Sequence, residues 1–425
     1  MTDELPLLVG REDRDVVVYC GSATLGAGDL IARSAHLYGR LPQRRFFVNT
    51  CERRGTFLIA LLAALRAGAT TLLPANPSVG AIAVLADLHP DQATLDDASV
   101  AAQVGPAIGS RVDRVRLSGQ PAVMVFTSGS TGVPQGHAKS WATLLAGAAL
   151  TGERLFAQTG PCNLVTTVPS QHMFGLETGV LLTLGAGCSV SDERPFFPRD
   201  IAAALEAVPA PRVLVTTPTH LRACVTAGIR LPPLAFALSS TASLAADQAA
   251  AAEAFVDAPV IEIYGCTEAG AMATRRTIEG DRWHGLPGAR FEPVDGGALY
   301  FSEHLPEPVA LQDLIDAATD GSFRLLGRAR DLVKVAGKRA SLADLTQKLL
   351  AVEGVADAVI FMPSDDGRCA ALVVAPLTSR EQILAALARH IDPAFLPRPL
   401  KLVAKLPRNE AGKLPRAALL AAIDE

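Results

Sequence analysis

The 425-residue sequence lacks long hydrophobic runs and an excess of charge of one sign. Its strongest apolar run, Phe57 to Leu65, has about half the length of a bilayer-spanning helix, so we expect no membrane span. The start, Met1 to Glu4, is acidic and shows no export signal. The formal net charge is −4, and acidic and basic residues are interspersed, which disfavours nucleic acid as a partner.

Paired cysteines are also missing. The sequence has no CxxC pair and no histidine near a cysteine at metal-ligand spacing. This pattern is typical of reduced thiols and predicts a cytoplasmic protein without a cysteine-bound metal. The seven cysteines are spread singly along the chain, at Cys20, Cys51, Cys162, Cys188, Cys224, Cys266 and Cys369.

The chain is long enough for two or more domains. Between residues 16 and 264, short apolar runs alternate with longer Ala/Leu-rich segments, which predicts an α/β core of parallel sheets covered by helices. The predicted helices include Ser140–Phe156, Ile201–Val208 and Leu244–Phe255. The predicted strands include Val16–Tyr19, Ala122–Phe126, Leu164–Val168, Val213–Thr217, Ala235–Ser239 and Val260–Tyr264.

The C-terminal part has a different pattern. Beyond Gly285 the sequence becomes richer in turns, and after Asp331 it indicates strands that carry Lys and Arg together with two or three helices. We therefore expect a large N-terminal domain over residues 1–328 and a small C-terminal domain over residues 329–425.

A Ser/Thr/Gly-rich loop over residues 127–134 follows one predicted strand and precedes a predicted helix. Glycines let backbone N–H groups approach an anion, hydroxyls add donors, and a helix N-terminus favours negative charge. A flexible surface turn is the alternative for such a cluster. The strand before the loop and the helix after it favour a phosphate site.

Three further segments carry candidate chemistry. Tyr264-Gly265-Cys266-Thr267-Glu268 places a carboxylate at the end of a predicted parallel strand, where α/β sheets bind ligands, although Glu268 could instead cap the next helix. Residues 327–339 form a charged run that could equally be a solvated face. Lys413, within residues 406–416, could equally be an exposed lysine of the C-terminal tail.

In this order, these segments resemble the motifs of the adenylate-forming superfamily, which includes acyl-CoA synthetases, luciferases and nonribosomal adenylation domains. The resemblance covers about residues 120–418. It implies an α/β fold with a large N-terminal domain of mixed and parallel helix-covered sheets and a small, mobile α+β C-terminal domain. Because the chain is shorter than most members, the resemblance also implies a trimmed N-terminal subdomain.

The resemblance implies ATP and Mg²⁺ as cofactors and assigns roles to individual residues. Glu268 and Thr127 would serve the metal, and Asp331 would be the hinge. Lys413, His172 and Glu268 would be catalytic, and His172, Met173 and Phe174 would line the acid pocket, although each of these three could also be ordinary core. The ATP site would comprise Thr127, Ser128, Gly129, Ser130, Thr131, Gly132, Lys139, Ser240, Thr241, Tyr264, Gly265, Thr267, Asp313 and Arg328.

The chain departs from the family at two places. Gln135 stands where members carry a lysine, and Lys139 is the hypothetical replacement for that charge. The usual Thr-Gly before Asp313 is missing, so Asp313 is inferred from position. Pro134-Gln135 followed by Lys139 and Trp141 resembles the short stand-alone ligases of aryl polyene and xanthomonadin-type pigment pathways.

The resemblance therefore implies a ligase that adenylates a carboxylic acid and transfers the acyl group to the phosphopantetheine thiol of an acyl carrier protein. The favoured substrate is an aryl acid such as a hydroxybenzoate. Two alternatives stay open: an aryl or fatty acid–CoA ligase with free coenzyme A as acceptor, and a non-catalytic relative that binds nucleotide or acid.

Overall fold

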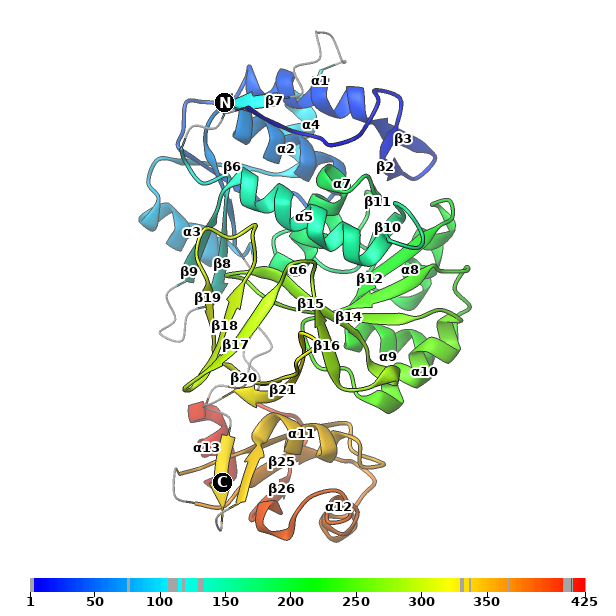
Figure 1. The fold of residues 1–425 in the computed structure, drawn as a ribbon, viewed down its shortest axis with the longest axis vertical. Coiled ribbons are helices and arrows are strands. Elements are labelled where there is room, and N and C mark those ends of the chain that lie inside the picture. The colour runs from blue at the N-terminus through cyan, green and yellow to red at the C-terminus, as the bar shows by residue number, and fades with distance from the viewer. Residues whose placement is uncertain are drawn as a thin grey trace. The chain divides into compact units, whose positions relative to one another are not determined.

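The structure is a computed structural model that describes residues 4–74, 77–105, 114–116, 119–128, 134–328, 332–335, 338–364, 367–407, 414 and 416–424. The chain forms two compact units (Figure 1). The first comprises Met1–Arg290 with Phe301–Val309, and the second comprises Phe291–Tyr300 with Ala310–Glu425. The expected hinge residue Asp331 lies outside the described residues, so the boundary after residue 328 stays a prediction.

The larger sheet of the first unit has the strand order β16-β15-β14-β13-β12-β10-β11-β2-β3. Strands β14, β13, β12, β10, β11 and β2 form a parallel series, and the pairs β14–β15, β15–β16 and β2–β3 are antiparallel. Its strands are β2 (Val16–Cys20), β3 (Ala23–Gly26), β10 (Asn163–Thr166), β11 (Ser189–Ser191), β12 (Arg212–Thr216), β13 (Phe236–Ser239), β14 (Val260–Cys266), β15 (Gly270–Arg276) and β16 (Arg282–Gly285).

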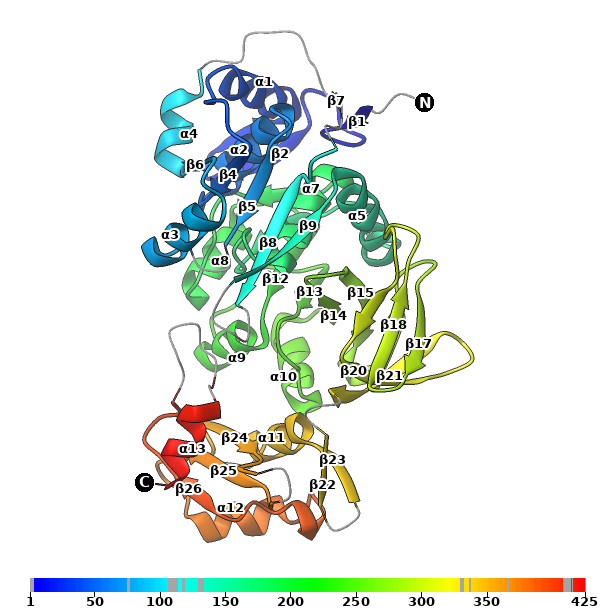
Figure 2. The same cartoon turned by 90° about the vertical axis from the view of Figure 1, so that its left-hand side faces the viewer.

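A second sheet of the first unit has the order β6-β4-β5-β8-β9, and Figure 2 shows β5, β8 and β9 side by side. Strands β6, β4, β5 and β8 are parallel, whereas β9 returns antiparallel to β8. Its strands are β4 (Phe46–Asn49), β5 (Thr70–Leu73), β6 (Gln92–Leu95), β8 (Val123–Ser128) and β9 (Pro134–Lys139). A short antiparallel pair joins β1 (Glu4–Pro6) to β7 (Arg114–Arg116).

Helices cover both faces of the larger sheet. Val165, Leu214 and Ala237 pack against α8, α9 and α10, whereas Leu164, Val213 and Leu238 belong to the main core of the unit. The helices of the unit are α1 (Ala27–Tyr38), α2 (Arg54–Arg66), α3 (Val79–Leu88), α4 (Asp97–Gln103), α5 (Trp141–Phe156), α6 (Met173–Gly175), the π-helical turn η1 (Leu176–Leu181), α7 (Leu182–Gly185), α8 (Pro198–Glu206), α9 (Pro218–Ala227), α10 (Ala246–Val256) and the 3₁₀ turn η2 (Thr277–Glu279).

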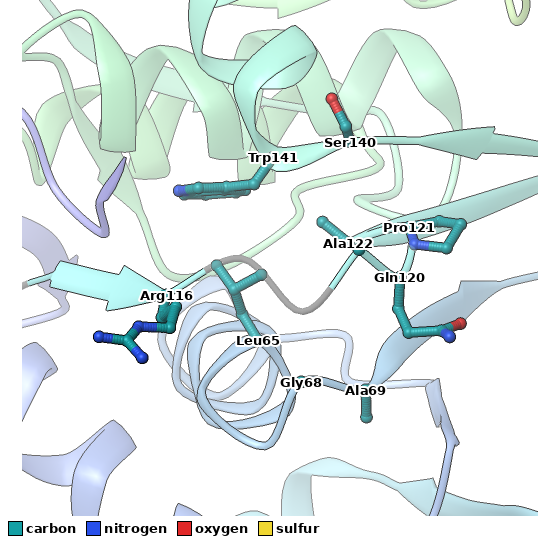
Figure 3. Close-up of a pocket in the computed structure, with 10 residues that line it drawn as sticks. Leu65, Gly68, Ala69, Arg116, Gln120, Pro121, Ala122, Ser140 and Trp141 are labelled. Carbon is teal, nitrogen blue, oxygen red and sulfur yellow. The ribbon is translucent and has the colours of Figure 1, made fainter. Parts of the chain in front are cut away.

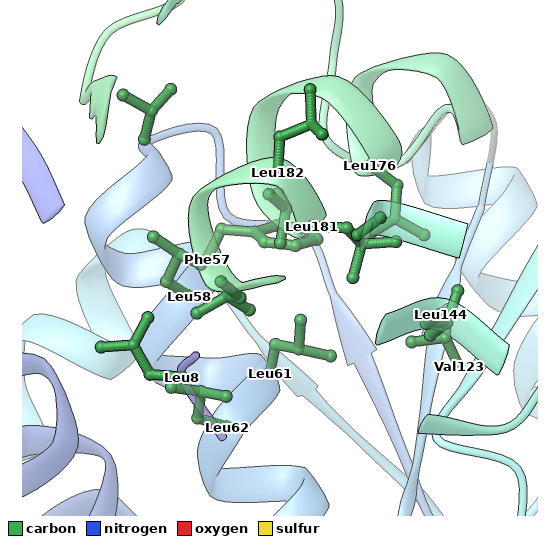
Figure 4. Packing of buried hydrophobic residues seen from close by; sticks show 14 of the residues in the cluster. Leu8, Phe57, Leu58, Leu61, Leu62, Val123, Leu144, Leu176, Leu181 and Leu182 are labelled. Carbon is green, nitrogen blue, oxygen red and sulfur yellow. The ribbon is translucent and has the colours of Figure 1, made fainter. Parts of the chain in front are cut away.

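The main core is built around α2. The apolar run Phe57–Leu65 is buried along its whole length, and Figure 4 shows its side chains packed against those of η1 and α7. A helix that is apolar on every side belongs inside a large core. No helix in the described part of the chain is long and apolar enough to cross a membrane.

The second unit is α+β. Its strands β24, β25 and β26 form a sheet on which Leu345, Leu349, Ile383 and Leu387 of two helices contribute to one core. Its elements are β17 (Arg290–Val294), β18 (Gly297–Phe301), β19 (Val309–Leu311), β20 (Asp313–Ala317), β21 (Ser322–Arg328), β22 (Leu332–Val335), β23 (Lys338–Ser341), α11 (Leu342–Leu350), β24 (Asp357–Phe361), β25 (Ala370–Val374), α12 (Arg380–Leu387), η4 (Pro393–Phe395), β26 (Leu400–Leu402) and α13 (Arg416–Asp424).

Candidate functional site

Two of the predicted nucleotide segments lie at the carboxyl ends of adjacent parallel strands. Ser240 follows β13, and Tyr264 lies near the end of β14. The Ser240 hydroxyl donates to the Ile263 carbonyl at 2.9 Å and so ties the two strand ends together. Thr241 has φ +78°, a left-handed backbone that is unfavourable for a β-branched residue. Such backbone strain is often found at functional sites.

The turn between β14 and β15 carries the remaining residues of this segment. A Cβ at Gly265 would lie 2.4 Å from the Gly270 carbonyl oxygen, so only glycine fits there. The Tyr264 ring lies 5.6 Å from the Trp283 ring, centroid to centroid. The Glu268 side chain is 50 % exposed, which leaves its carboxylate accessible to a ligand.

The β8–β9 hairpin meets this turn through His137, which the sequence analysis does not select. The His137 Nε2 atom lies 3.2 Å from the Thr127 hydroxyl, within hydrogen-bond distance. The other ring nitrogen, Nδ1, lies 3.8 Å from the Glu268 Oε1 atom. One imidazole therefore bridges the start of the predicted phosphate loop and the predicted metal carboxylate.

Several predicted residues lie outside the described part of the chain. These are Gly129, Ser130, Thr131 and Gly132 of the phosphate loop, the hinge Asp331 and the catalytic Lys413. Ser128 and Arg328 are described as the last residues of β8 and β21, without their side chains. The assignments of these residues stay predictions.

Asp313 belongs to the second unit, where β20 pairs with β21. Asp313 stands opposite Arg328 in the antiparallel register of this hairpin. These two predicted ATP-site residues are thus held as neighbours across one ladder. Thr267 is partly buried in the β14–β15 turn of the first unit.

The predicted acid-pocket residues begin at His172, whose ring is held at the start of α6. Its Nδ1 atom accepts from the Phe174 N–H at 3.2 Å, so the ring proton lies on Nε2 in the neutral form. His172 is exposed, whereas Met173 and Phe174 are 7 % and 5 % exposed and belong to the main core. A Cβ at Gly175 would lie 2.0 Å from the Pro169 carbonyl oxygen, so this turn also requires glycine.

A buried arginine holds the residues that precede His172. Arg54 donates to the Ser170 hydroxyl at 2.8 Å and to the Val168 carbonyl at 2.6 Å. Complete burial lowers the pKa of the Arg54 guanidinium to about 10. Gln171 donates to the Cys51 carbonyl at 2.8 Å. The residues immediately before His172 are therefore fixed by side chains rather than by regular secondary structure.

Two charged side chains bind main-chain groups of the β14–β15 turn and of the start of β15. Lys139 is 6 % exposed and donates to the Glu268 main-chain carbonyl, and burial lowers the pKa of its ammonium. Glu177 lies in η1 and accepts from the Ala271 N–H at 2.8 Å. Burial raises the pKa of Glu177 to about 7, while the Ala271 N–H and the Lys139 charge oppose the rise.

His304 completes the support of this turn. Its Nε2 atom lies 3.4 Å from the Ala269 carbonyl oxygen, and its Nδ1 atom lies 2.7 Å from the Ser302 hydroxyl. Burial is the largest cause that lowers the pKa of the His304 imidazole, and the nearby Lys139 charge also lowers it. Main-chain groups of residues 268, 269 and 271 are therefore each bound by a polar side chain.

Within the described ranges, no group of three or more His, Cys, Asp or Glu side chains could hold a metal ion. A single carboxylate suits Mg²⁺, which proteins often bind through one or two carboxylates together with substrate phosphates. The side-chain chemistry around Glu268 therefore fits a metal bound together with a nucleotide.

The pocket in Figure 3 lies elsewhere. It is lined by residues from α2, the start of β8 and the start of α5, including Leu65, Ala122 and Trp141. The β8–β9 hairpin opens toward the phosphate loop at Ser128 and Pro134, whereas Ala122 and Ser140 flank its opposite end. None of the predicted site residues lines this pocket.

Several known proteins resemble this chain in sequence. The AMP-binding enzyme family matches residues 82–290. A 4-coumarate–CoA ligase from Halorhodospira halophila is 29 % identical over 305 residues, which is 68 % of this chain and 73 % of that protein. Residues 82–290, just under half of the chain, thus resemble the AMP-binding enzyme superfamily. A probable 2-succinylbenzoate–CoA ligase from Mycobacterium tuberculosis is 27 % identical, covering 70 % of this chain and 84 % of the relative.

Solved structures confirm the fold of this superfamily. The o-succinylbenzoate CoA synthetase from Bacillus subtilis, in complex with an acyl-adenylate intermediate, matches with a TM-score of 0.82 at 16 % identity over 98 % of each chain. The same enzyme in complex with ATP and magnesium matches with a TM-score of 0.80 at 16 % identity, over 97 % of this chain and 99 % of that one. The expected α/β fold with a smaller C-terminal domain is therefore confirmed.

The family match and the relatives also support the expected chemistry at a coarse level, that of an AMP-forming acid–thiol ligase. Two proteins that share the fold were solved with anthranoyl-AMP and with ATP and magnesium. The roles of individual residues stay predictions.

No motif in the sequence identifies His137, Glu177, Arg54 or His304 as residues of the site. One signal could have found His137: it lies two residues before Lys139 in a strand, so both side chains lie on the same face. Glu177 and Arg54 stand within apolar helical runs, where a charged residue is rare unless it has a buried partner. No sequence signal separates His304 from an ordinary loop histidine.

Proposed function

We propose that this enzyme adenylates an aryl carboxylic acid and transfers the acyl group to the phosphopantetheine thiol of an acyl carrier protein, in aryl polyene or xanthomonadin-type pigment biosynthesis. The observation that carries the adenylation step is the contact chain from Thr127 through His137 to Glu268. This chain joins the strand that enters the phosphate loop to the carboxylate at the end of β14. ATP phosphates bound by that loop would therefore lie near Glu268.

In the proposed first half-reaction, a carboxylate oxygen of the acid attacks the α-phosphorus of ATP and pyrophosphate leaves. Positioning and charge neutralisation would supply the catalysis, without a covalent nucleophile from the protein. Mg²⁺, held by Glu268 with Thr127, would neutralise phosphate charge. Lys413 would place an ammonium beside the two anions, and then leave as the C-terminal domain turns about Asp331.

The preference for an aryl acid has three supports. The first is the resemblance of residues 134–141 to the pigment-pathway ligases. The second is that the relatives include ligases named for coumarate and succinylbenzoate, both aromatic acids. The apolar pair Met173 and Phe174 next to His172 suits a flat ring, because aromatic substrates bind apolar and aromatic side chains. The exposed His172 would cover the carboxylate end.

Free coenzyme A is the alternative acceptor, and the relatives favour it because they are named as CoA ligases. The cytoplasm is the proposed location, because all seven cysteines are free in the structure and cytosolic proteins keep their thiols reduced.

Carboxylate-dependent ATP–pyrophosphate exchange tests the first step. A panel of hydroxybenzoates, hydroxycinnamates and fatty acids should give exchange with aryl acids and little with fatty acids. Glu268→Gln should lose most of this exchange, and Ala138→Ser, an exposed change on β9, is the matched control. Absence of exchange with every acid would refute adenylation and favour a binding role.

Acceptor choice is tested separately. The purified enzyme, its preferred acid and MgATP are incubated with carrier protein or with coenzyme A, and acyl load is measured by intact mass. We expect the carrier protein to be loaded faster. Faster acylation of coenzyme A would leave the adenylation step intact and replace the carrier by the free thiol.

A further inference from the structure

Strand β9 presents two polar side chains to the same glutamate. His137 and Lys139 are separated by one residue, so they lie on one face of the strand, while Ala138 between them is exposed. The His137 ring lies 3.8 Å from the Glu268 carboxylate. The Lys139 ammonium donates to the Glu268 main-chain carbonyl. One strand therefore contacts both the side chain and the backbone of Glu268.

The position of Lys139 along the hairpin separates it from the phosphate loop. Ser128 pairs with Pro134 at the loop end, whereas Lys139 pairs with Val123 at the opposite end. Five residues of antiparallel strand span about 17 Å, more than a lysine side chain reaches. Lys139 is also 6 % exposed. Its ammonium therefore contacts the main chain of the β14–β15 turn at Glu268 and not the phosphate loop.

Glu177 compensates the buried charge of Lys139. The charges of Glu177 and Lys139 interact, and the Glu177 carboxylate also accepts from the Ala271 N–H at 2.8 Å. A Cβ at Gly270 would lie 2.3 Å from the Glu177 Oε1 atom, so the carboxylate packs directly on the Gly270 backbone. The residues on both sides of Ala269 are thereby fixed.

We propose that His137, Lys139 and Glu177 are positioning residues that hold Glu268 in the orientation needed for the nucleotide-bound metal, a task that this chain performs without a lysine at position 135. His137 orients the carboxylate, Lys139 binds the Glu268 main-chain carbonyl, and Glu177 fixes the main chain at Gly270 and Ala271. This inference rests on the proposed role of Glu268 in the adenylation step. Gln135 is exposed and is not one of the proposed positioning residues.

A double-mutant cycle distinguishes positioning through Glu268 from a direct phosphate contact. Lys139→Met should lower ATP–pyrophosphate exchange about 10- to 100-fold, the usual range for residues that support a metal ligand. In a Glu268→Gln background, the same substitution should lower the residual exchange by less than about threefold, because coupled residues are non-additive. We expect His137→Ala to show the same two effects as Lys139→Met, a large loss of exchange alone and a small further loss in the Glu268→Gln background. Ala138→Ser, on the exposed face of β9, should leave exchange unchanged.

Nucleotide binding gives a readout that is independent of turnover. Isothermal titration with ATP should show that Lys139→Met and His137→Ala weaken binding in the presence of Mg²⁺ and leave binding in excess EDTA close to that of the unmodified enzyme. A direct phosphate contact predicts equal weakening in both conditions. A Lys139→Met variant that fails to fold is replaced by Lys139→Met/Glu177→Gln, which removes both interacting charges and avoids an unpaired buried one.

The outcomes separate this inference from the proposed function. Additive losses in the cycle, or equal weakening with and without Mg²⁺, would overturn the positioning role while the unmodified enzyme still catalyses exchange. No exchange by the unmodified enzyme with any acid would overturn the proposed function instead, and the Mg²⁺-dependent binding data would then decide the positioning role alone.

Discussion

Replacing Glu177 by glutamine removes a carboxylate whose pKa is raised by burial to about 7, from a model-compound value of 4.5. An acid with a folded-state pKa above its unfolded-state value binds its proton more tightly when folded. Its contribution to stability is therefore neutral below the unfolded-state pKa and becomes increasingly unfavourable as pH rises toward the folded-state pKa. Glutamine keeps an oxygen that can accept from Ala271 and does not titrate.

The size of the effect follows from the two pKa values. The ionisation penalty of Glu177 amounts to about 1.4 kcal/mol near pH 5.5 and about 3.3 kcal/mol near pH 8. The free energy of unfolding of Glu177→Gln, relative to the unmodified enzyme, should therefore rise by about 2 kcal/mol between these pH values. Groups that interact with Glu177 or Lys139 include Cys266, Glu268 and His304, and all three are unchanged in the variant.

Urea unfolding followed by tryptophan fluorescence suits this measurement. The chain has two tryptophans, and both Trp141 and Trp283 are buried in the first unit together with Glu177. Lys139→Met/Glu177→Gln is the control that removes the partner charge as well. A difference between variant and unmodified enzyme that stays constant from about pH 5.5 to about pH 8 would refute a carboxylate that titrates near neutrality.

Four other substitutions test other parts of the structure. Arg54→Ala should destabilise the first unit by about 2–4 kcal/mol in urea unfolding, because two hydrogen bonds from a buried charged donor are lost. Gly175→Ala should cost more than about 2 kcal/mol, because its Cβ would overlap the Pro169 carbonyl. Thr241→Gly should stabilise by about 1 kcal/mol, since glycine tolerates the backbone at φ +78°. Lys413→Ala should abolish ATP–pyrophosphate exchange, while acyl transfer from a pre-made adenylate, measured by mass, largely survives.

The sequence predicts the parallel core well, because its strands are short apolar runs with clear boundaries. The predicted strand Val213–Thr217 corresponds to β12, and the predicted helix Ser140–Phe156 corresponds to α5. Before residue 120, the sequence resembles the adenylate-forming superfamily only in its general architecture. There α2 is apolar on every side, so its sequence lacks the periodic pattern that identifies an amphipathic helix.

The candidate site is predictable where a motif is contiguous and unpredictable where side chains converge from separate elements. Tyr264 and Glu268 are predicted from the sequence because both belong to one contiguous motif at the end of a strand. Glu177, by contrast, reaches Ala271 across 94 residues of sequence. The contact depends on how η1 packs against β15, which no local pattern specifies. Lys139 shows the same limit: its charge is visible in the sequence, but its burial behind Glu268 is not.

The π-helical geometry of Leu176–Leu181 makes the length of this segment as important as its composition. A π-helical turn contains more residues than an α-helical one, and such turns arise when a single residue is inserted into an α-helix. If this segment kept its present length but were an ordinary α-helix, each residue beyond the turn would be rotated by about 100° about the helix axis. Leu181 and Leu182 would then leave the main core. The π-helical turn therefore keeps the core leucines in phase with His172, and a chain one residue shorter here would need an α-helical turn in its place.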